Sequence, residues 1–287
     1  MKPRFAISQI LTWFALAEAL SLPKSSQSQE LTTVRRDVQF SQSAPYASDA
    51  EITRRLGFRV AFPGYDVTNE TFRIIAPQTY PTNVSWGLFV WISPNDDPVL
   101  PSDWERELAN DHLVVASACR SGNQRHPMDR FRLALDATCN SCRQFKIDRQ
   151  RIYVAGFSGG ARIASMLGVG YADLFTGTLC VCGVNFYKRV PTLERKYFPA
   201  TYVPDPGVLL LAKRNGHFVL LTGETDPNRQ ITKDTMENGF KPNGFKNVLY
   251  VEVPGMSHVI PDAATLRRAL VFFSRTNLPS PVPSVYR

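Results

Sequence analysis

The segment Gly156-Phe157-Ser158-Gly159-Gly160 has the spacing G-x-S-x-G, in which a serine stands between small residues at a sharp turn. The residues just before it, 151–155, are mostly β-branched or aromatic and predict a buried strand. The residues just after it, 161–167, carry apolar side chains at helical spacing. A strand, a tight turn and a helix in this order would expose the Ser158 hydroxyl at the positive end of the helix dipole. We therefore expect Ser158 to be a nucleophile; the alternative is a glycine-rich turn with a surface serine.

A nucleophilic serine needs a general base, and two histidines follow Ser158 in the sequence. His258 lies in a turn-rich loop just after a predicted strand at 247–253, so it should lie beyond the carboxyl end of that strand. His217 begins the apolar run 217–221, which places it at the amino end of a strand and at the opposite edge of the sheet. We expect His258 to be the base and His217 to be a polar residue at a strand start.

The acid that orients the histidine should leave the carboxyl end of the preceding strand. The predicted strand 218–222 runs into a loop that carries Glu224 and Asp226. We expect Asp226 to be the acid, with Glu224 as the alternative; Asp226 could also simply cap a following helix. In the expected arrangement His258 takes the proton of Ser158. The Asp226 carboxylate then holds the imidazole tautomer and stabilises the imidazolium.

The predicted elements that must position these residues alternate between strands and helices along the chain. This alternation indicates an α/β protein with a mostly parallel central sheet and helices on both faces. Only about thirty residues separate the strands at 178–184 and 218–222, which is too short for a large lid domain. The expected strands are 33–40, 71–76, 87–92, 113–118, 151–155, 178–184, 218–222 and 247–253. The expected helices are 102–110, 128–145, 161–167 and 263–273.

The sequence around the serine, residues 147–162, resembles the elbow region of α/β-hydrolase esterases related to polyhydroxybutyrate depolymerases and to feruloyl or acetyl-xylan esterases. Residues 223–226 and 255–258 match the acid and histidine loops of that family, and the resemblance covers roughly residues 70–275. It implies the α/β-hydrolase fold and carboxylic-ester hydrolysis through an acyl-enzyme intermediate. The positions that match the family's catalytic residues are Ser158, Asp226 and His258.

The loop after the third predicted strand departs from the family pattern. Many members carry His-Gly there, whereas this chain has Ser93-Pro94-Asn95, followed by two aspartates. An oxyanion hole needs two backbone N–H donors, and the first should come from Gly159, directly after the nucleophile. Pro94 has no N–H, so we expect the second donor to be the Asn95 amide, with Asp96 and Asp97 facing water. The alternative is an ordinary Pro-Asn-Asp turn.

The predicted strand 178–184 is followed directly by Asn185, Phe186 and Tyr187, which should lie at its carboxyl end. We expect them to line the substrate cleft; the alternative is a loop that packs its aromatic rings onto the core. The short connection that follows favours an accessible site, compatible with a bulky or polymeric ester.

Composition favours one globular domain, because the chain has 287 residues, 44% of them hydrophobic and 20% charged. The net charge is +8, but the basic residues are scattered and do not alternate with aromatic residues, so we expect no nucleic-acid partner. The five cysteines leave disulfide pairing open, and we expect Cys180 and Cys182 to be buried on one face of a strand. No histidine or second C-x-x-C completes a metal site, so we expect no metal and no cofactor.

The first nineteen residues resemble a secretory signal. Lys2 and Arg4 precede the mostly apolar run 5–16, and Ala17-Glu18-Ala19 offers a small-x-small cleavage site. We expect a secreted or periplasmic protein with no membrane span in the mature chain; the alternative is an uncleaved amphipathic helix. The expected division of the chain is a signal peptide at 1–19, a polar amino-terminal segment at 20–50, a hydrolase domain at 51–276 and a Pro-rich tail at 277–287.

Three functions are compatible with these residues. The first is an extracytoplasmic serine esterase acting on a small-molecule or polymeric ester. The second is a serine peptidase on the same fold, and the third is a catalytically silent binding protein. The sequence leaves the natural ester and the oligomeric state open.

Overall fold

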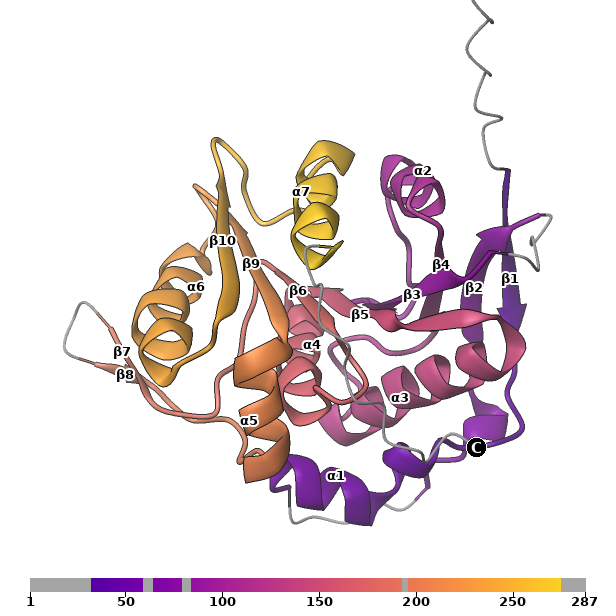
Figure 1. Cartoon of the computed structure of the whole chain (residues 1–287), viewed down its shortest axis with the longest axis horizontal. Helices are drawn as coiled ribbons and strands as arrows, with labels where there is room; N and C mark the ends of the chain where they lie inside the picture. The colour runs from indigo at the N-terminus through magenta and orange to yellow at the C-terminus, as the bar shows by residue number, and fades with distance from the viewer. Residues whose placement is uncertain (1–31, 59–63, 79–83, 193–195, 275–287) are drawn as a thin grey trace, which may run out of the picture. The chain divides into compact units, whose positions relative to one another are not determined.

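The structure is a computed structural model that describes residues 32–58, 64–78, 84–192 and 196–274. Its centre is an eight-stranded sheet with the order β1-β2-β4-β3-β5-β6-β9-β10 (Figure 1). β2 is antiparallel to its neighbours β1 and β4, and all other neighbouring strands of this sheet are parallel. The mostly parallel sheet predicted from the sequence is therefore confirmed. The strands are β1 (Thr33–Val38), β2 (Phe72–Pro77), β3 (Trp86–Ile92), β4 (Leu113–Ala118), β5 (Ile147–Phe157), β6 (Gly177–Val181), β9 (His217–Gly223) and β10 (Asn247–Val253).

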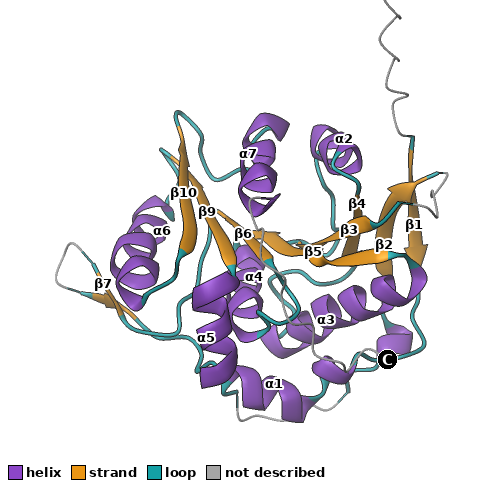
Figure 2. Cartoon of the chain, viewed as in Figure 1, coloured by secondary structure: helices purple, strands orange, loops and turns teal. Residues whose placement is uncertain are grey.

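Helices cover both faces of the sheet (Figure 2). One face carries α2 and α7, and the core beneath them contains Trp104 and Phe273. The other face carries α3 and α4 with α1 and α5 outside them, and its core contains Phe131 and Leu167. The helices are α1 (Asp49–Leu56), α2 (Ser102–Asn110), α3 (Pro127–Gln144), α4 (Gly159–Gly170), α5 (Pro206–Asn215), α6 (Arg229–Asp234) and α7 (Ala263–Ser274).

The central strands are almost entirely apolar because helices bury them from both sides. Every residue of β3 and of β4 is buried. The bounds of β4, β10 and α2 coincide with those predicted, whereas β5 begins four residues earlier than predicted, at Ile147.

Between β6 and β9 the described residues hold a two-stranded ribbon and the helix α5. The ribbon pairs β7 (Val190–Pro191) with β8 (Tyr197–Phe198). Asp205 caps α5 by accepting hydrogen bonds from the amides of Gly207 and Val208, at 2.9 and 3.1 Å. This connection is short, as predicted.

The polar segment expected at 20–50 is partly built into the fold. β1 pairs along its length with β2, and Phe40 and Tyr46 are buried in the core. α1 begins at Asp49, where the Ser48 hydroxyl accepts the amide of Glu51, so the boundary expected between 50 and 51 falls inside this helix.

The strand expected at 178–184 ends earlier, at Val181, and this changes the prediction for the two cysteines. Cys182 has a φ of 55°, in the left-handed region, so the regular alternation of side chains stops there. Cys180 packs into the core on one face of the sheet and Cys182 into the core on the other, which corrects the prediction of a shared face. No disulfide joins any two of the five cysteines, all of which lie among the described residues.

The signal peptide expected at 1–19 and the tail expected at 277–287 lie outside the described residues. Within the part of the chain that the structure describes, no helix combines the length and apolarity needed to cross a membrane.

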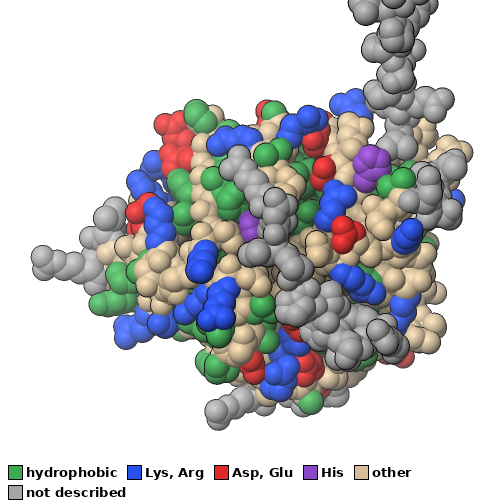
Figure 3. All heavy atoms as spheres, in the orientation of Figure 1, with side chains coloured by type: hydrophobic (Ala, Val, Ile, Leu, Met, Phe, Trp, Pro, Cys, Tyr) green, Lys and Arg blue, Asp and Glu red, His purple; other side chains and the backbone are tan. Residues whose placement is uncertain are grey.

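Acidic and basic side chains are interspersed over the face of the molecule that Figure 3 shows.

Candidate active site

Ser158 lies in a sharp turn between β5 and α4. Its backbone has φ 54° and ψ −117°, a strained conformation for a residue with a side chain, and its amide donates to the carbonyl of Val181 at 2.8 Å. The two outer glycines of the motif, Gly156 and Gly160, are required because neighbouring backbone atoms lie too close to leave room for a side chain. A Cβ at Gly156 would lie 2.4 Å from the carbonyl carbon of Gly160, and one at Gly160 would lie 1.9 Å from the carbonyl oxygen of Ile92.

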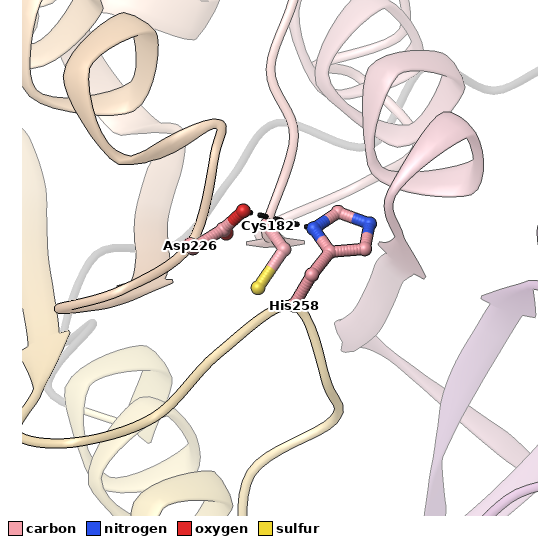
Figure 4. Close-up of side chains that lie close together, drawn as sticks. All are labelled: Cys182, Asp226 and His258. Atoms are coloured by element: carbon pink, nitrogen blue, oxygen red, sulfur yellow. Dashed lines mark hydrogen bonds and ion pairs between the residues drawn. The ribbon is translucent and has the colours of Figure 1, made fainter.

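The structure brings Ser158, His258 and Asp226 together at the carboxyl edge of the sheet. His258 Nε2 lies 2.9 Å from Ser158 Oγ, and His258 Nδ1 lies 2.9 Å from Asp226 Oδ1. Figure 4 shows the imidazole directed toward the carboxylate across the gap between their two loops. β5, β9 and β10 run parallel, so the loops that follow them all emerge at this edge and carry the three side chains there.

The Asp226 carboxylate is buried and held from several sides. Its Oδ2 accepts the Thr222 hydroxyl at 2.9 Å, and its Oδ1 accepts the Asn228 amide at 2.9 Å in addition to the imidazole. Burial alone would raise the pKa of Asp226. Hydrogen bonds from the Cys182 thiol, Asn228, His258 and Thr222 outweigh it and lower that pKa below its ordinary value. The carboxylate is therefore ionised at neutral pH, as an orienting acid must be.

The alternative acid, Glu224, points elsewhere. It is exposed, and its Oε2 accepts the backbone amide of Gly255 at 2.8 Å. Two further hydrogen bonds, from the amide and the hydroxyl of Thr225 to the carbonyl of Met256 at 3.0 Å, join the same two loops. Glu224 thus helps to hold the loop of His258 in place, while the contact with the imidazole is made by Asp226.

His217 lies at the amino end of β9, as the sequence indicated. Its Nδ1 lies 2.9 Å from the carbonyl oxygen of Asn215, and its ring packs against Phe272. Burial lowers its pKa, which keeps the imidazole neutral at neutral pH. This position is at the opposite edge of the sheet from Ser158.

Of the two donors expected for an oxyanion hole, Gly159 is the first residue of α4 and directly follows Ser158. The Asn95 amide already has a partner within its own loop, because it donates to Ser93 Oγ at 3.0 Å. To donate to a substrate oxygen, the Asn95 amide would first have to break its hydrogen bond to Ser93 Oγ. Asp96 and Asp97 are exposed, and Asp97 pairs with Arg73.

The three residues expected to line the cleft divide into two groups. Phe186 and Tyr187 are buried and pack in an aromatic cluster with Phe240 and Phe245. They therefore take the core-packing role that was the alternative in the sequence analysis. Asn185 is half-buried, and its amide donates to Ser165 Oγ at 2.9 Å. Its place in a substrate cleft stays a prediction.

Searches against solved structures find many proteins with the same architecture. An S-formylglutathione hydrolase from Staphylococcus aureus has 13% identity and a TM-score of 0.54, covering 84% of this chain and 99% of that chain. The feruloyl esterase module from Clostridium thermocellum has 14% identity and a TM-score of 0.51, covering 83% of this chain and 92% of that chain. The chain has the α/β-hydrolase fold. An acylaminoacyl peptidase from Pyrococcus horikoshii shares this fold at 13% identity, with a TM-score of 0.50 over 71% of this chain and 39% of that chain.

Sequence comparison adds little to this assignment of an α/β-hydrolase fold. No family model matches the chain. A hyaluronate lyase from Thermasporomyces composti is 35% identical over 77 residues, which are 25% of this chain and 10% of that protein. The chain thus spans about a tenth of the length of that relative.

Two residues beside Ser158, Asp226 and His258 were not predicted. Phe157 packs its ring against the imidazole of His258, with centroids 4.9 Å apart, and the signal for it was its place next to the serine in the G-x-S-x-G motif. Cys182 lies against Asp226, and one possible metal-ligand atom from each of Cys182, Asp226 and His258 lies within 4.8 Å of the others (Figure 4). Both ring nitrogens of His258 already contact Asp226 and Ser158, so a metal ion could bind there only by displacing these contacts.

Proposed function

We propose that this chain is a serine esterase, which hydrolyses carboxylic esters through an acyl-enzyme intermediate. The observation that carries the proposal is the continuous line of contacts from Ser158 Oγ through the imidazole of His258 to the buried Asp226 carboxylate, with both distances at 2.9 Å. The base lies within hydrogen-bond reach of both the nucleophile and the orienting acid, as nucleophilic catalysis requires.

In the first half of the proposed reaction, Ser158 Oγ attacks the ester carbonyl carbon while His258 Nε2 takes the hydroxyl proton. The carbonyl oxygen becomes an oxyanion that accepts the Gly159 amide, with the Asn95 amide as the second donor once it has left Ser93 Oγ. Collapse of this intermediate breaks the bond to the alcohol oxygen. His258 returns its proton to that oxygen, and the alcohol leaves.

In the second half, water replaces the alcohol. His258 Nε2 takes a proton from the water as its oxygen attacks the acyl carbon, and a second oxyanion forms. Its collapse breaks the bond to Ser158 Oγ, which recovers its proton from His258 as the carboxylic acid leaves. Asp226 stabilises the imidazolium in both halves and keeps its charge throughout.

The likeness to a hydrolase and to an esterase module over nearly their whole length supports ester substrates. The short connection between β6 and β9 supports a site open to a bulky or polymeric ester as well as to a small one. The basic start and apolar run at the beginning of the chain support secretion, so the proposed site of action is outside the cytoplasm.

A peptidase would use the same three residues, and the likeness to an acylaminoacyl peptidase makes this the second candidate. The test is turnover of a chromogenic short-chain acyl ester beside a chromogenic peptide anilide, by the wild type and by Ser158→Ala. We expect ester turnover by the wild type and none by the variant. Faster turnover of the anilide would favour the peptidase. Absence of both activities, with no labelling of Ser158 by a fluorophosphonate probe, would leave a non-catalytic protein.

A further inference from the structure

A buried arginine lies directly beside the turn that carries Ser158. Arg130, from α3, is only 4% exposed. Its Nη2 donates to the carbonyl of Ser93 at 2.9 Å, and its Nη1 lies 3.4 Å from the carbonyl of Gly159. The guanidinium therefore joins the loop after β3 to the first turn of α4, which are the two segments expected to supply the oxyanion donors.

No carboxylate pairs with Arg130 within the described residues, and its Nε has no hydrogen-bond partner there. Burial lowers its pKa to about 10, so the side chain still carries its positive charge at neutral pH. A buried cation that lacks an acidic partner is costly to maintain, and such groups concentrate at functional sites. Its remaining contact is a side chain, the carboxamide of Asn123, whose Oδ1 lies 3.3 Å from Nη1.

The backbone around Asn123 is hydrogen-bonded to the loop after β3. The Asn123 amide donates to the carbonyl of Pro94 at 2.9 Å. The Gly122 amide donates to Asp96 Oδ1 at 3.0 Å, and the Arg120 amide donates to the Asp96 carbonyl at 2.7 Å. The backbone of Asn123 is therefore bonded to the loop after β3, although its side chain is exposed.

The chemistry of arginine fixes which end of the Asn123 carboxamide faces inward. Arg130 can only donate hydrogen bonds, so the atom that faces it must be the amide oxygen. A Cβ built on Gly159 would lie 2.0 Å from this Oδ1 and 3.1 Å from Nδ2, so the carboxamide stands against the residue that follows Ser158. Nδ2 is left as an exposed donor without a partner in the described part of the chain.

The geometry points to Asn123 as a catalytic residue whose Nδ2 donates a hydrogen bond to an oxygen of the reacting ester, with Arg130 as the positioning residue that orients the carboxamide. This inference rests on the proposed esterase function and adds a side-chain donor to the backbone donors of the oxyanion hole. A fixed donor of this kind lowers the barrier because it is already oriented when negative charge develops on the substrate.

The decisive variant is Asn123→Asp, because it separates activity from stability. An aspartate keeps the size of the side chain and gives the buried Arg130 a carboxylate partner, so the melting temperature should stay the same or rise. It removes the Nδ2 donor and places a negative charge beside the developing oxyanion, so kcat for the ester should fall by about 10²-fold with a smaller change in KM. The matched control is Gln124→Glu, which makes the same amide-to-carboxylate change at the neighbouring exposed residue and should leave both quantities near those of the wild type.

Arg130 is tested through its coupling to Asn123. Asn123→Ala and Arg130→Lys should each lower kcat, and the double variant should lose little more than the worse single variant, because both substitutions remove one oriented donor. Full additivity would overturn the positioning role. If Arg130→Lys fails to fold, the Asn123→Asp result decides the proposal alone.

The outcomes distinguish this inference from the proposed function. Wild-type ester turnover with normal kcat in Asn123→Asp would overturn the inference and leave the esterase intact. A loss of activity in Asn123→Asp that accompanies a lower melting temperature would give Asn123 a structural role and overturn the inference. An equal loss in Gln124→Glu would show a general electrostatic effect and would also overturn the inference. Absence of turnover in the wild type would overturn the proposed function, and the inference with it.

Discussion

His258 and Ser158 are separated by 100 positions in the chain, yet His258 Nε2 lies 2.9 Å from Ser158 Oγ. The contact depends on the backbone of Ser158, whose φ of 54° turns the side chain out of the end of β5. It also depends on the loop of His258, which Glu224 and Thr225 hold in place through backbone contacts.

Ser158→Ala is expected to abolish ester turnover while the protein remains folded. The hydroxyl of the half-buried Ser158 contacts His258 and contributes little to packing, and triad losses typically lower the rate by about 10⁴-fold or more. Steady-state kinetics together with circular dichroism and a melting curve measure the two effects. A folded variant with wild-type turnover would show that Ser158 is not the nucleophile.

Asp226→Asn should lower kcat by about 10⁴-fold, because an amide favours the wrong imidazole tautomer. Glu224→Gln is the matched control, and its effect should be small because Glu224 contacts the backbone of Gly255 instead of His258. Rate measurements on both variants decide the matter. The reverse ranking would make Glu224 the acid.

Asn95→Pro removes the backbone N–H expected to complete the oxyanion hole and should lower kcat by about 10²–10³-fold. Asn95→Ala keeps that N–H and should be much milder. Proline also perturbs the loop, so a melting curve must accompany the kinetics. Near-wild-type turnover in both folded variants would exclude the Asn95 amide from the mechanism.

Gly160→Ala should destabilise the fold by at least about 2 kcal/mol, because the added methyl would have to displace backbone. It would lie 1.9 Å from the carbonyl oxygen of Ile92. Gly207→Ala, in the first turn of α5, is the matched control: its methyl would come no closer than 3.3 Å to Asp205 Oδ1, and alanine favours the helix. Urea unfolding compares the two, and equal free energies of unfolding would argue against the tight packing of the elbow.

Asp136 should make stability depend on pH. Its carboxylate is buried in α3, where Oδ2 accepts the Tyr65 hydroxyl at 2.5 Å, and burial raises its pKa from 3.8 to about 6. Between these two pH values the folded protein holds a proton on Asp136 that the unfolded chain has released. The contribution of Asp136 to the free energy of unfolding is therefore fully present below pH 3.8 and is lost as the pH rises through about 6. The loss amounts to roughly 3 kcal/mol.

Asp136→Asn removes this titration, since an amide stays neutral. Between pH 4 and pH 7.5, the wild type should therefore lose more of its free energy of unfolding than the variant does, with the difference approaching the roughly 3 kcal/mol that the shifted pKa implies. Denaturant titrations of both proteins at the two pH values measure it. Parallel pH profiles would mean that the pKa of Asp136 is not raised in the folded state.

The central strands and the helices that cover them could be predicted because the apolar residues in their sequences follow the pattern of burial that each element has in the fold. β3 and β4 are buried on both faces and are therefore apolar throughout. α1 was missed because its sequence carries only two large apolar residues, Ile52 and Leu56. Its position depends on distant contacts, such as the pair of hydrogen bonds from Arg55 to Asp173 at 2.6 and 2.8 Å, which no local pattern reveals.

The places of Ser158, Asp226 and His258 could be predicted because parallel strands bring their carboxyl ends to one edge. The finer details could not, since they depend on loop conformation. The hydrogen bond between the Asn95 amide and Ser93 Oγ forms only in the turn that this loop adopts. The inward turn of Phe186 depends on partners, Phe240 and Phe245, that lie more than fifty residues away in the sequence.

The order of the strands has a consequence for how the protein acquires its site during folding. Ser158 follows β5, whereas Asp226 and His258 follow β9 and β10, at the far end of the sheet. Parallel neighbours are joined by long crossover segments, and such non-local pairings form slowly. A refolding chain should therefore regain most of its helical signal before Ser158 becomes reactive toward a fluorophosphonate. The fraction of molecules whose Ser158 hydroxyl reacts would then measure the fraction in which β10 has paired with the sheet.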